Sequence, residues 1–527
     1  MTWSLAVMDD GITNALQTRI GKVTVVEYDY YYQFPDTDDG IPNTHSNKVT
    51  LSALSVSAVY DLIDLKIESA ITHDISESAI EIALRDVLSD EEFSIAAINM
   101  SFGGPSYPFA FADEISQLAN RGILTVAAAG NDGSHTSREF PAYPALLSDV
   151  IAVGSHDGFG NPSDFSQNGP GVDILADGED MPSLGLDGTS FAAPRVAATV
   201  THVQAIVDGL TGTRLSVGQM IDALQIGGAG PRSSPDPADG VTRYFLHDHA
   251  GSLDYAWYKY GGTPTTALEY VASHADLIGA FGVNTDLGRL HFEHNGSVEE
   301  RAISFDGLEY IASYRDLSAA FHTNAYAGAS HYIRAGHHEG RAVTFDGLEY
   351  IASYGDLIGA FGANQDAGST HYIGSGYGEG RRAMFDGLEY IASYGDLIGV
   401  FGPNQDAGSS HFIRSGFVEG RITTFDGLQY IASHGDLIVA FGANSEVGSI
   451  HYIGLGYGEG RPADTFGAAQ YLANYADLRA AFGTDQDAAT RHFVTHGFYE
   501  GRTDEPAGAA GFVEALDPAA GSADFLL

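Results

Sequence analysis

The sequence predicts an α/β domain with a parallel sheet and helices on both faces, followed by an all-α repeat domain of short helices. Before about residue 260, short apolar runs such as LAVM, VTVV and VIAVG alternate with amphipathic stretches such as SESAIEIALRDVL. From residue 264 onward, one pattern returns about every 40 residues. With 527 residues the chain is also too long for one ordinary core.

These observations divide the chain into three parts: residues 1–260, residues 264–503 with six repeats, and a tail of residues 504–527. Apolar strands that alternate with amphipathic helices are typical of a parallel sheet that is covered on both faces. The stretch GGAGPRSSPDPADG is expected to be a surface loop near the end of the first part, and KYGGTPTT is the expected linker to the repeats.

Each repeat carries a tyrosine, a histidine and an arginine in a fixed register. They are Tyr270, Tyr310, Tyr350, Tyr390, Tyr430 and Tyr471, then His291, His331, His371, His411, His451 and His492, then Arg301, Arg341, Arg381, Arg421, Arg461 and Arg502. In one unit, Asp346 and Glu349 have the spacing of a capping box, and Gly362 and Gly376 are expected to end helices. We therefore predict two or three short helices per unit that bury one face against a neighbour, with the histidine in a packing or capping role.

Composition excludes several classes of function. Acidic residues outnumber basic ones 69 to 25, and a formal net charge of −44 argues against binding to nucleic acid. No unbroken apolar stretch reaches the roughly 18–20 residues that span a bilayer, so we expect no membrane span. The absence of cysteine excludes disulfides, a thiol nucleophile and a thiolate metal site.

One histidine pair invites a metal interpretation. In an extended strand, His247 and His249 would lie on the side opposite Asp248, and no further ligands cluster near them in the sequence. We therefore predict no metal site among these residues.

Four polar residues stand where predicted strands end or helices begin. Asp9 follows LAVM, His45 precedes a run of small and apolar residues, Asn131 follows LTVAAAG, and Ser190 begins the helix of GTSFAAP. The carboxyl ends of parallel strands are where such sheets build their sites. Taken singly, each residue also has a structural interpretation as a turn, packing or capping residue. The stretch AAINM resembles a buried strand that ends at SFGG, whose glycines would let a substrate backbone approach closely.

Taken together and in this order, the motifs resemble those of the subtilisin-like serine peptidases (subtilases). VMDDG is similar to the family's aspartate motif, SFGG to its substrate-binding strand, AAAGNDG to its oxyanion-hole segment, GTSFAAPRVAA to its nucleophile helix and GSLDYAWY to its closing segment. The resemblance covers about half of the chain, residues 1–260. Asp10, Phe191 and Arg195 are departures from the usual motifs. Around His45 the sequence NTHSNKV replaces the family's usual HGTHVAG.

The resemblance implies a subtilisin-like fold and assigns a role to each candidate. Asp9, His45 and Ser190 would form the catalytic triad, and Asn131 with the Ser190 backbone N–H would hold the oxyanion. Ser101, Phe102, Gly103 and Gly104 would bind the substrate. The implied chemistry requires no cofactor, and structural calcium is compatible with the family and the acidic composition. Only eight residues precede Asp9, so the propeptide that many subtilases carry is not expected unless an N-terminal piece is missing.

Two hypotheses follow. The first is an exported serine endopeptidase that cleaves protein or peptide substrates and whose repeats bind a surface or matrix component. The repeats resemble HYxxxGxxEGR units of large secreted bacterial proteins, and the final AGSADFLL resembles a type I secretion signal, which would explain the lack of an N-terminal signal peptide. A cytoplasmic location is the alternative. The second hypothesis is a non-enzymatic surface or adhesion protein with a degenerate peptidase fold, which the unusual histidine motif favours.

Overall fold

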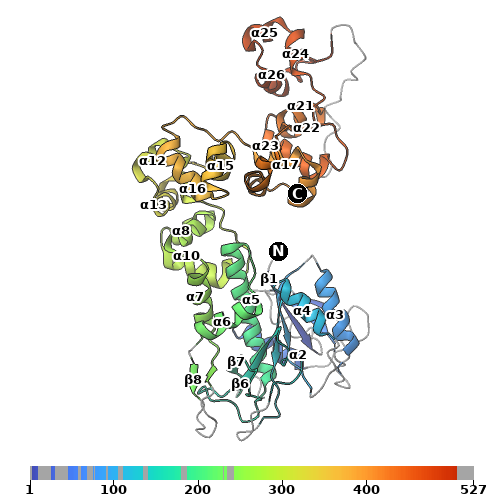
Figure 1. Cartoon of the computed structure of the whole chain (residues 1–527), viewed down its shortest axis with the longest axis vertical. Coiled ribbons are helices and arrows are strands. Elements are labelled where there is room, and N and C mark those ends of the chain that lie inside the picture. Colours follow the sequence, from blue (N-terminus) through green and yellow to red (C-terminus); the bar gives the residue numbers. More distant parts are fainter. Residues whose placement is uncertain are drawn as a thin grey trace. The chain divides into compact units, whose positions relative to one another are not determined.

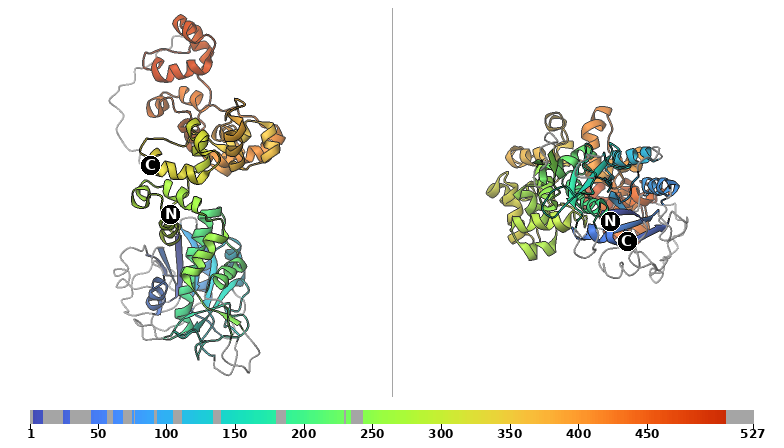
Figure 2. Two further views of the ribbon diagram at one scale, coloured as in Figure 1. Left: turned by 90° about the vertical axis from the view of Figure 1, so that its left-hand side faces the viewer. Right: turned by 90° about the horizontal axis from the view of Figure 1, so that it is seen from below.

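The computed structural model describes most of the chain, coloured along the sequence in Figures 1 and 2. The described residues are 3–9, 25–29, 45–56, 61–67, 75, 77–90, 93–104, 111–133, 140–179, 187–228, 231–233 and 243–506. Internal contacts divide the chain into two units. The first unit is Met1–Asp306 with Ala329–Arg341, and the second is Gly307–Gly328 with Ala342–Leu527.

The first unit contains a seven-stranded parallel sheet in the order β2-β3-β1-β4-β5-β6-β7. Its strands are β1 (Trp3–Asp9), β2 (Val25–Asp29), β3 (Asp61–Lys66), β4 (Ser94–Met100), β5 (Leu124–Ala128), β6 (Val150–His156) and β7 (Ile174–Asp177). Every residue of β1 is buried, because helices cover both faces of the sheet. The predicted fold class is confirmed.

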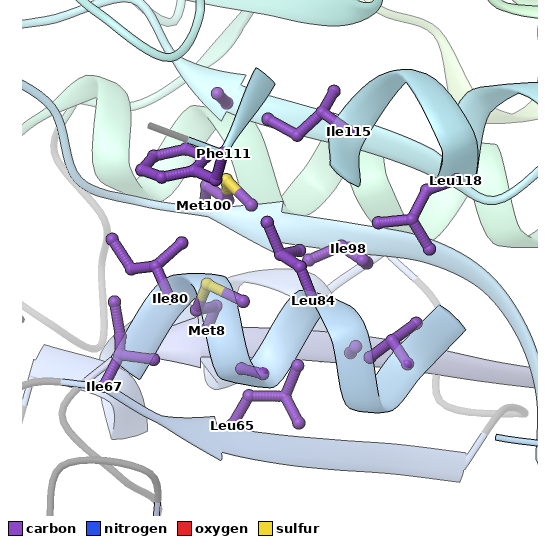
Figure 3. Packing of buried hydrophobic residues seen from close by; sticks show 14 of the residues in the cluster. Met8, Leu65, Ile67, Ile80, Leu84, Ile98, Met100, Phe111, Ile115 and Leu118 are labelled. Carbon is purple, nitrogen blue, oxygen red and sulfur yellow. The ribbon is translucent and has the colours of Figure 1, made fainter. Parts of the chain in front are cut away.

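Helices cover the two faces of the sheet (Figure 1). They are α2 (His45–Leu54), α3 (Glu77–Ser89), α4 (Ala112–Asn120), α5 (Thr189–Thr211) and α6 (Val217–Gly227). Helix α7 (His249–Lys259) packs against α5 and α6. Figure 3 shows Ile80 and Leu84 of α3 packed with Met8 and Ile98 of the sheet. On the other face, α5 contacts β4, β5 and β6.

Two local expectations differ from the structure. The expected loop contains a short strand, β8 (Pro231–Ser233), which pairs antiparallel with β9 (Arg243–Phe245). The HDH sequence does not lie on one strand, because Asp248 is the N-cap of α7 and accepts a hydrogen bond from the Gly251 N–H. The pattern of alternating faces assumed for an extended strand therefore does not apply to these residues.

The repeats consist of three short helices each, the third continuing into a π-helical turn. The first repeat has α8 (Pro264–Ala272), α9 (Ala275–Phe281), α10 (Thr285–His291) and η2 (Phe292–Gly296). The next two have α11 (Gly307–Ala312), α12 (Arg315–Phe321), α13 (Ala325–His331) and η3 (Tyr332–Gly336), then α14 (Gly347–Ala352), α15 (Gly355–Phe361), α16 (Gln365–His371) and η4 (Tyr372–Gly376).

The last three repeats follow the same order. They have α17 (Gly387–Ala392), α18 (Gly395–Phe401), α19 (Gln405–His411), η5 (Phe412–Gly416) and α20 (Phe417–Glu419); α21 (Gly427–Ala432), α22 (Gly435–Phe441), α23 (Ser445–His451) and η6 (Tyr452–Gly456); and α24 (Ala468–Asn474), α25 (Ala476–Phe482), α26 (Gln486–His492) and η7 (Phe493–Gly497).

The expected capping box of the third repeat is only half formed. Asp346 is the N-cap of α14 and its Oδ1 accepts the Glu349 N–H at 2.8 Å. The Glu349 side chain does not reach back to Asp346; its Oε1 accepts the N–H of Gly387 in the next repeat at 2.9 Å. The expected helix end at Gly362 is present, with a φ of +56° that favours glycine. Glu349 therefore links neighbouring repeats.

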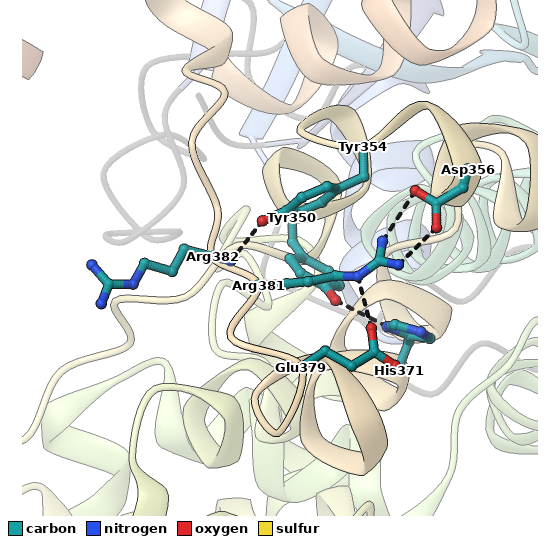
Figure 4. A network of polar contacts seen from close by, with 7 residues as sticks. All are labelled: Tyr350, Tyr354, Asp356, His371, Glu379, Arg381 and Arg382. Atoms are coloured by element: carbon teal, nitrogen blue, oxygen red, sulfur yellow. Dashed lines mark hydrogen bonds and ion pairs between the residues drawn. The ribbon is translucent and has the colours of Figure 1, made fainter.

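In the first repeat and in the last four, the periodic tyrosine contacts the histidine, and the periodic arginine pairs with two carboxylates, as Figure 4 shows for the third repeat. The Tyr350 hydroxyl lies 2.9 Å from His371 Nδ1, and Arg381 pairs with Asp356 and Glu379 at 2.8 Å each. Tyr350 is fully buried, and burial raises its pKa to about 12. These contacts give the recurrent residues structural partners within their own repeat.

The first repeat packs into the first unit. The Trp3 N–H donates to Val298 O at 3.1 Å, and the rings of Trp257 and Phe292 meet edge to face with centroids 5.5 Å apart. A Cβ on Gly209 of α5 would lie 2.9 Å from the Phe292 ring. Strand β1 and helices α5 and α7 thus share a core with the first repeat.

A group of histidines lies where α5 and α7 meet the first repeat. The Thr199 hydroxyl lies 2.7 Å from His247 Nε2 and 2.8 Å from His249 Nδ1, so both histidines of the HDH sequence face the same side chain. His202 Nδ1 is 3.3 Å from His249 Nε2, and the ring centroids of His249 and His294 are 6.5 Å apart. Burial lowers the pKa of His249 to about 4 and that of His247 to about 3.

We expect Phe292→Ala to destabilise the first unit by about 3–5 kcal/mol, because it removes a fully buried ring from a shared core. Trp3 and Trp257, the two tryptophans of the chain, both lie in the first unit, so thermal unfolding followed by tryptophan fluorescence reports on that unit. Phe493→Ala, at the matching position of the last repeat, is the control and should leave this transition in place. An unchanged midpoint for Phe292→Ala would contradict a shared core.

The buried histidines predict a loss of stability in acid. Their folded-state pKa values lie below the ordinary value of 6.5, so their contribution is complete above pH 6.5. It is lost as the pH falls from about 6.5 to about 4 for His249 and to about 3 for His247. We expect the tryptophan-fluorescence midpoint to fall over this range, and to fall less in His249→Gln. If the midpoint changes with pH equally in the wild type and in His249→Gln, His249 is not a source of the acid sensitivity.

Candidate active site

Ser190 lies at the beginning of α5, a helix of 23 residues. Gly188, the N-cap residue, is extended, and Thr189 and Ser190 form the start of the first turn. Backbone N–H groups in a first helical turn have no helical acceptor, and the helix dipole makes this end electropositive. The Ser190 backbone N–H is therefore placed where a negatively charged oxygen would be stabilised.

Ser190 and Ser101 exchange two hydrogen bonds. The Ser190 hydroxyl donates to Ser101 O at 3.0 Å, and the Ser101 hydroxyl donates to Ser190 O at 2.8 Å. Pro194 explains the second bond: it stands four residues after Ser190 and has no N–H to give to that carbonyl. Asn99 Nδ2 also donates to the Ser101 hydroxyl oxygen at 3.0 Å. The end of β4 is thus bonded to the nucleophile candidate.

The Asn131 amide is held in one orientation by Thr189. Both the backbone N–H and the hydroxyl of Thr189 donate to Asn131 Oδ1, each at 2.9 Å. The Gly130 N–H in turn donates to the Thr189 hydroxyl oxygen at 3.2 Å. With Oδ1 engaged, Nδ2 turns the other way, to within 3.5 Å of the position that a Cβ on Gly188 would take. Asn131 is exposed, so this amide can donate to a bound molecule.

The segment Ser101–Gly104 continues from β4. Gly104 forms an antiparallel bridge with Tyr143, donating its N–H to Tyr143 O at 3.1 Å. A Cβ on Gly103 would lie 2.9 Å from Tyr143 O, which explains the small residue there. The side chain of Phe102 packs against the hydrophobic cluster that Figure 3 shows in part. The expected substrate-binding residues are therefore held by Tyr143 along one edge and by the packing of Phe102 against the core.

Asp9 and His45 stand on elements that contact the Ser190 helix. Asp9 is the buried last residue of β1, and neighbouring Met8 pairs with Met100, directly before Ser101. His45 is the first residue of α2, a helix that contacts both β1 and α5. The side chain of His45 lies outside what the structure describes, so the distances within the expected triad stay untested.

Among known protein families, residues 58–224 match the model of the subtilase family. Residues 58–224 form a subtilase domain. The matched range contains Asn131 and Ser190, and Asp9 and His45 precede it.

Several relatives share parts of this domain. Subtilisin DY of Bacillus licheniformis is 39% identical over 113 residues, which are 20% of this chain and 41% of the relative. Alkaline protease 1 of Aspergillus oryzae is 34% identical over 133 residues, 24% of this chain and 32% of the relative. The chain thus spans about two fifths or less of the length of these relatives. A solved cold adapted subtilisin-like serine proteinase is 21% identical, with a TM-score of 0.37, and the match covers 47% of this chain and 89% of that one.

Within the subtilase domain, the contacts that orient the site could not be predicted from the sequence. Thr189 stands in the GTS motif, but its two bonds to Asn131 join residues 58 positions apart. The exchange between Ser101 and Ser190 spans 89 positions. The one available signal was Pro194, since a proline inside a helix leaves the carbonyl four residues earlier without its helical donor. Only the tertiary structure decides which group donates to that carbonyl.

The loop that carries Asn131 depends on a close backbone approach at Gly133. Its N–H donates to Phe165 O at 2.9 Å, and a Cβ there would lie 2.2 Å from Ser166 O. We expect Gly133→Ala to destabilise the domain by about 1–3 kcal/mol or more, because the backbone must move apart. In the matched control, Gly158→Ala, the added methyl meets nothing within 4 Å, and we expect a change within about 0.5 kcal/mol. Equal stabilities in chemical denaturation would contradict the packing.

Proposed function

We propose that the subtilase domain is a serine endopeptidase in which Ser190 is the nucleophile. The observation that carries this proposal is the orientation of the Asn131 amide next to the electropositive start of α5. Asn131 Nδ2 and the Ser190 N–H would be the two donors to the developing oxyanion. The Thr189 bonds that hold the amide and the position of Ser190 in the first turn of α5 support this assignment. A serine used only as a helix cap would not need the adjacent asparagine to be fixed by Thr189.

In the proposed reaction, His45 accepts the Ser190 proton as its oxygen attacks the scissile carbonyl carbon. Asp9 orients the imidazole and stabilises its charged form. The carbonyl oxygen becomes an oxyanion held by Asn131 Nδ2 and the Ser190 N–H. His45 then protonates the leaving amine, and water releases the acyl group by the same steps in reverse order. No cofactor takes part in these steps.

Before attack, the Ser190 hydroxyl must leave the Ser101 carbonyl. This requires a rotation about one side-chain bond and the loss of one hydrogen bond, a cost of about 1 kcal/mol. Such a rotation is small compared with the barrier of peptide hydrolysis. The contact with Ser101 O is therefore compatible with a resting state in which the hydroxyl is kept near its working position.

The substrate is proposed to be an extended peptide that pairs with Ser101–Gly104. The N–H and C=O groups of Gly104 are used by Tyr143 at one edge. Along an extended segment, the groups of neighbouring Gly103 point to the opposite edge, where an added strand can bind them. This mode uses main-chain hydrogen bonds, so it suits a protease that accepts many sequences.

We further propose that the protein acts outside the cell by a type I-like route, that calcium stabilises it, and that the repeats bind a surface or matrix component. The support is chemical: the chain is strongly acidic and has no cysteine. Among the described residues, no helix combines the length and apolar character needed to cross a bilayer. The competing hypothesis, a non-enzymatic adhesion protein, rests on the departure of the His45 motif from the family pattern.

We expect Ser190→Ala and His45→Ala each to abolish labelling by a fluorophosphonate probe and hydrolysis of casein. Asn131→Ala should lower turnover by about 10²–10³-fold, the range that loss of the oxyanion asparagine produces in subtilisin. Ser216→Ala is the matched control: Ser216 also begins a helix, as the N-cap of α6, so the variant should lose about 1 kcal/mol of stability and keep its labelling.

The same experiment separates the two hypotheses. A well-folded wild-type protein that neither labels nor cleaves, with calcium supplied, would contradict the peptidase and leave adhesion as the explanation. Labelling that survives His45→Ala would contradict the proposed general base while keeping Ser190 as the nucleophile.

A further inference from the structure

Helix α2, which begins with His45, is fixed to α5 by two polar contacts near its other end. The first is buried: the Ser52 hydroxyl donates to Phe191 O at 2.6 Å, and Ser52 is fully buried. Phe191 directly follows Ser190. This hydrogen bond therefore ties α2 to the turn of α5 that carries the proposed nucleophile.

The second contact is made by Arg195, one of the positions at which the nucleophile helix departs from the usual family motif. Its Nη1 donates to the Ser55 hydroxyl oxygen at 3.1 Å, just after α2 ends. Its Nη2 lies 3.9 Å from Asp177 Oδ2 at the end of β7. Ser55 also donates its own hydroxyl to Ser52 O at 2.6 Å, which joins the two contacts.

These contacts fix the placement of α2 relative to Ser190. The helix has ten residues, about 15 Å in length, with His45 at one end and the contacts near the other. A small change in the tilt or rotation of the helix would shift the imidazole, and a misplacement of about 1 Å can lower the rate of a proton transfer by about 10²-fold. Apolar packing between two helices tolerates such slippage more easily than a directional hydrogen bond does.

We propose that Ser52 and Arg195 are positioning residues that set where His45 meets Ser190. The proposal rests on the serine peptidase function proposed above. Neither side chain touches substrate in this assignment; both act through α2. The Arg195 guanidinium is suited to the task because its planar group can bind Ser55 and face Asp177 at once, which lysine can do only in part.

The test measures kcat and KM for a peptide substrate together with the rate of fluorophosphonate labelling. We expect Arg195→Met, Ser55→Ala and Ser52→Ala each to lower kcat about tenfold and to leave KM within about twofold, since substrate binding is untouched. Arg195→Lys and Ser52→Thr should recover part of the loss. The double variant of Arg195→Met with Ser55→Ala should be no slower than the worse single variant, because both remove the same contact.

Arg85→Met is the matched control. Arg85 pairs with Glu81 and Glu114 on α3 and α4, on the other face of the sheet, so its removal should leave kcat unchanged. The tryptophan-fluorescence midpoint is recorded for every variant. A merely structural role would move the midpoint and would not give the selective loss in kcat.

Each outcome decides. An active wild type whose folded Arg195→Met and Ser52→Ala variants keep full kcat overturns this proposal and leaves the peptidase function standing. If the losses in kcat of Arg195→Met and Ser55→Ala add up in the double variant, the two side chains do not act through one shared contact. An inactive wild type removes the peptidase function itself, and the positioning role with it.

Discussion

Helix α5 is the element on which the first unit depends. Ser190 stands at its start, α2 and the sheet pack along its length, and its last turns contact the first repeat. Such a position requires the helix to be apolar on all sides, and nearly every residue from Thr189 to Val207 is buried. The polar residues that it buries have hydrogen bonds: Gln204, for example, donates to Gly122 O and Leu215 O. A site built on so enclosed a helix is held rigidly.

The repeats, like the first unit, are stabilised by burial of apolar side chains. A repeat of three short helices cannot bury its apolar face alone. In the last three repeats, a buried tyrosine and the isoleucine or leucine that follows it therefore join one continuous core. The Glu349 carboxylate also links two repeats by accepting the Gly387 N–H, although its burial disfavours the charged form. The pKa of Glu349 is raised to about 8: burial is the main cause, the Gly387 N–H opposes the shift, and nearby Asp346, Asp386 and Asp406 add to it. A buried carboxylate with a raised pKa favours acid solution, whereas the buried histidines near α5 favour neutral solution.

Much of the architecture could be predicted because it depends on short-range periodicity. Strands buried on both faces produce apolar runs, and the recurrence of a tyrosine, a histidine and an arginine marks the repeats. The order of the motifs around Asp9, Asn131 and Ser190 indicated the subtilase family, which the family match over residues 58–224 confirms. The roles of Asp9, His45, Asn131 and Ser190 stay predictions, and so do those of Ser101–Gly104. The His247–Asp248–His249 prediction assumed an extended strand, which fails because Asp248 caps a helix.

By itself, the sequence determined the α/β class, the repeats and the candidate nucleophile, since each follows from neighbours within one helix, strand or motif. The tertiary structure alone decided that Thr189 orients Asn131, that Ser101 and Ser190 exchange hydrogen bonds, and that the first repeat shares a core with α5. It also decided that Glu349 binds the next repeat rather than its own cap. The reason is physical: a hydrogen-bond donor takes whichever acceptor the fold brings within about 3 Å, and that acceptor can stand anywhere in the chain.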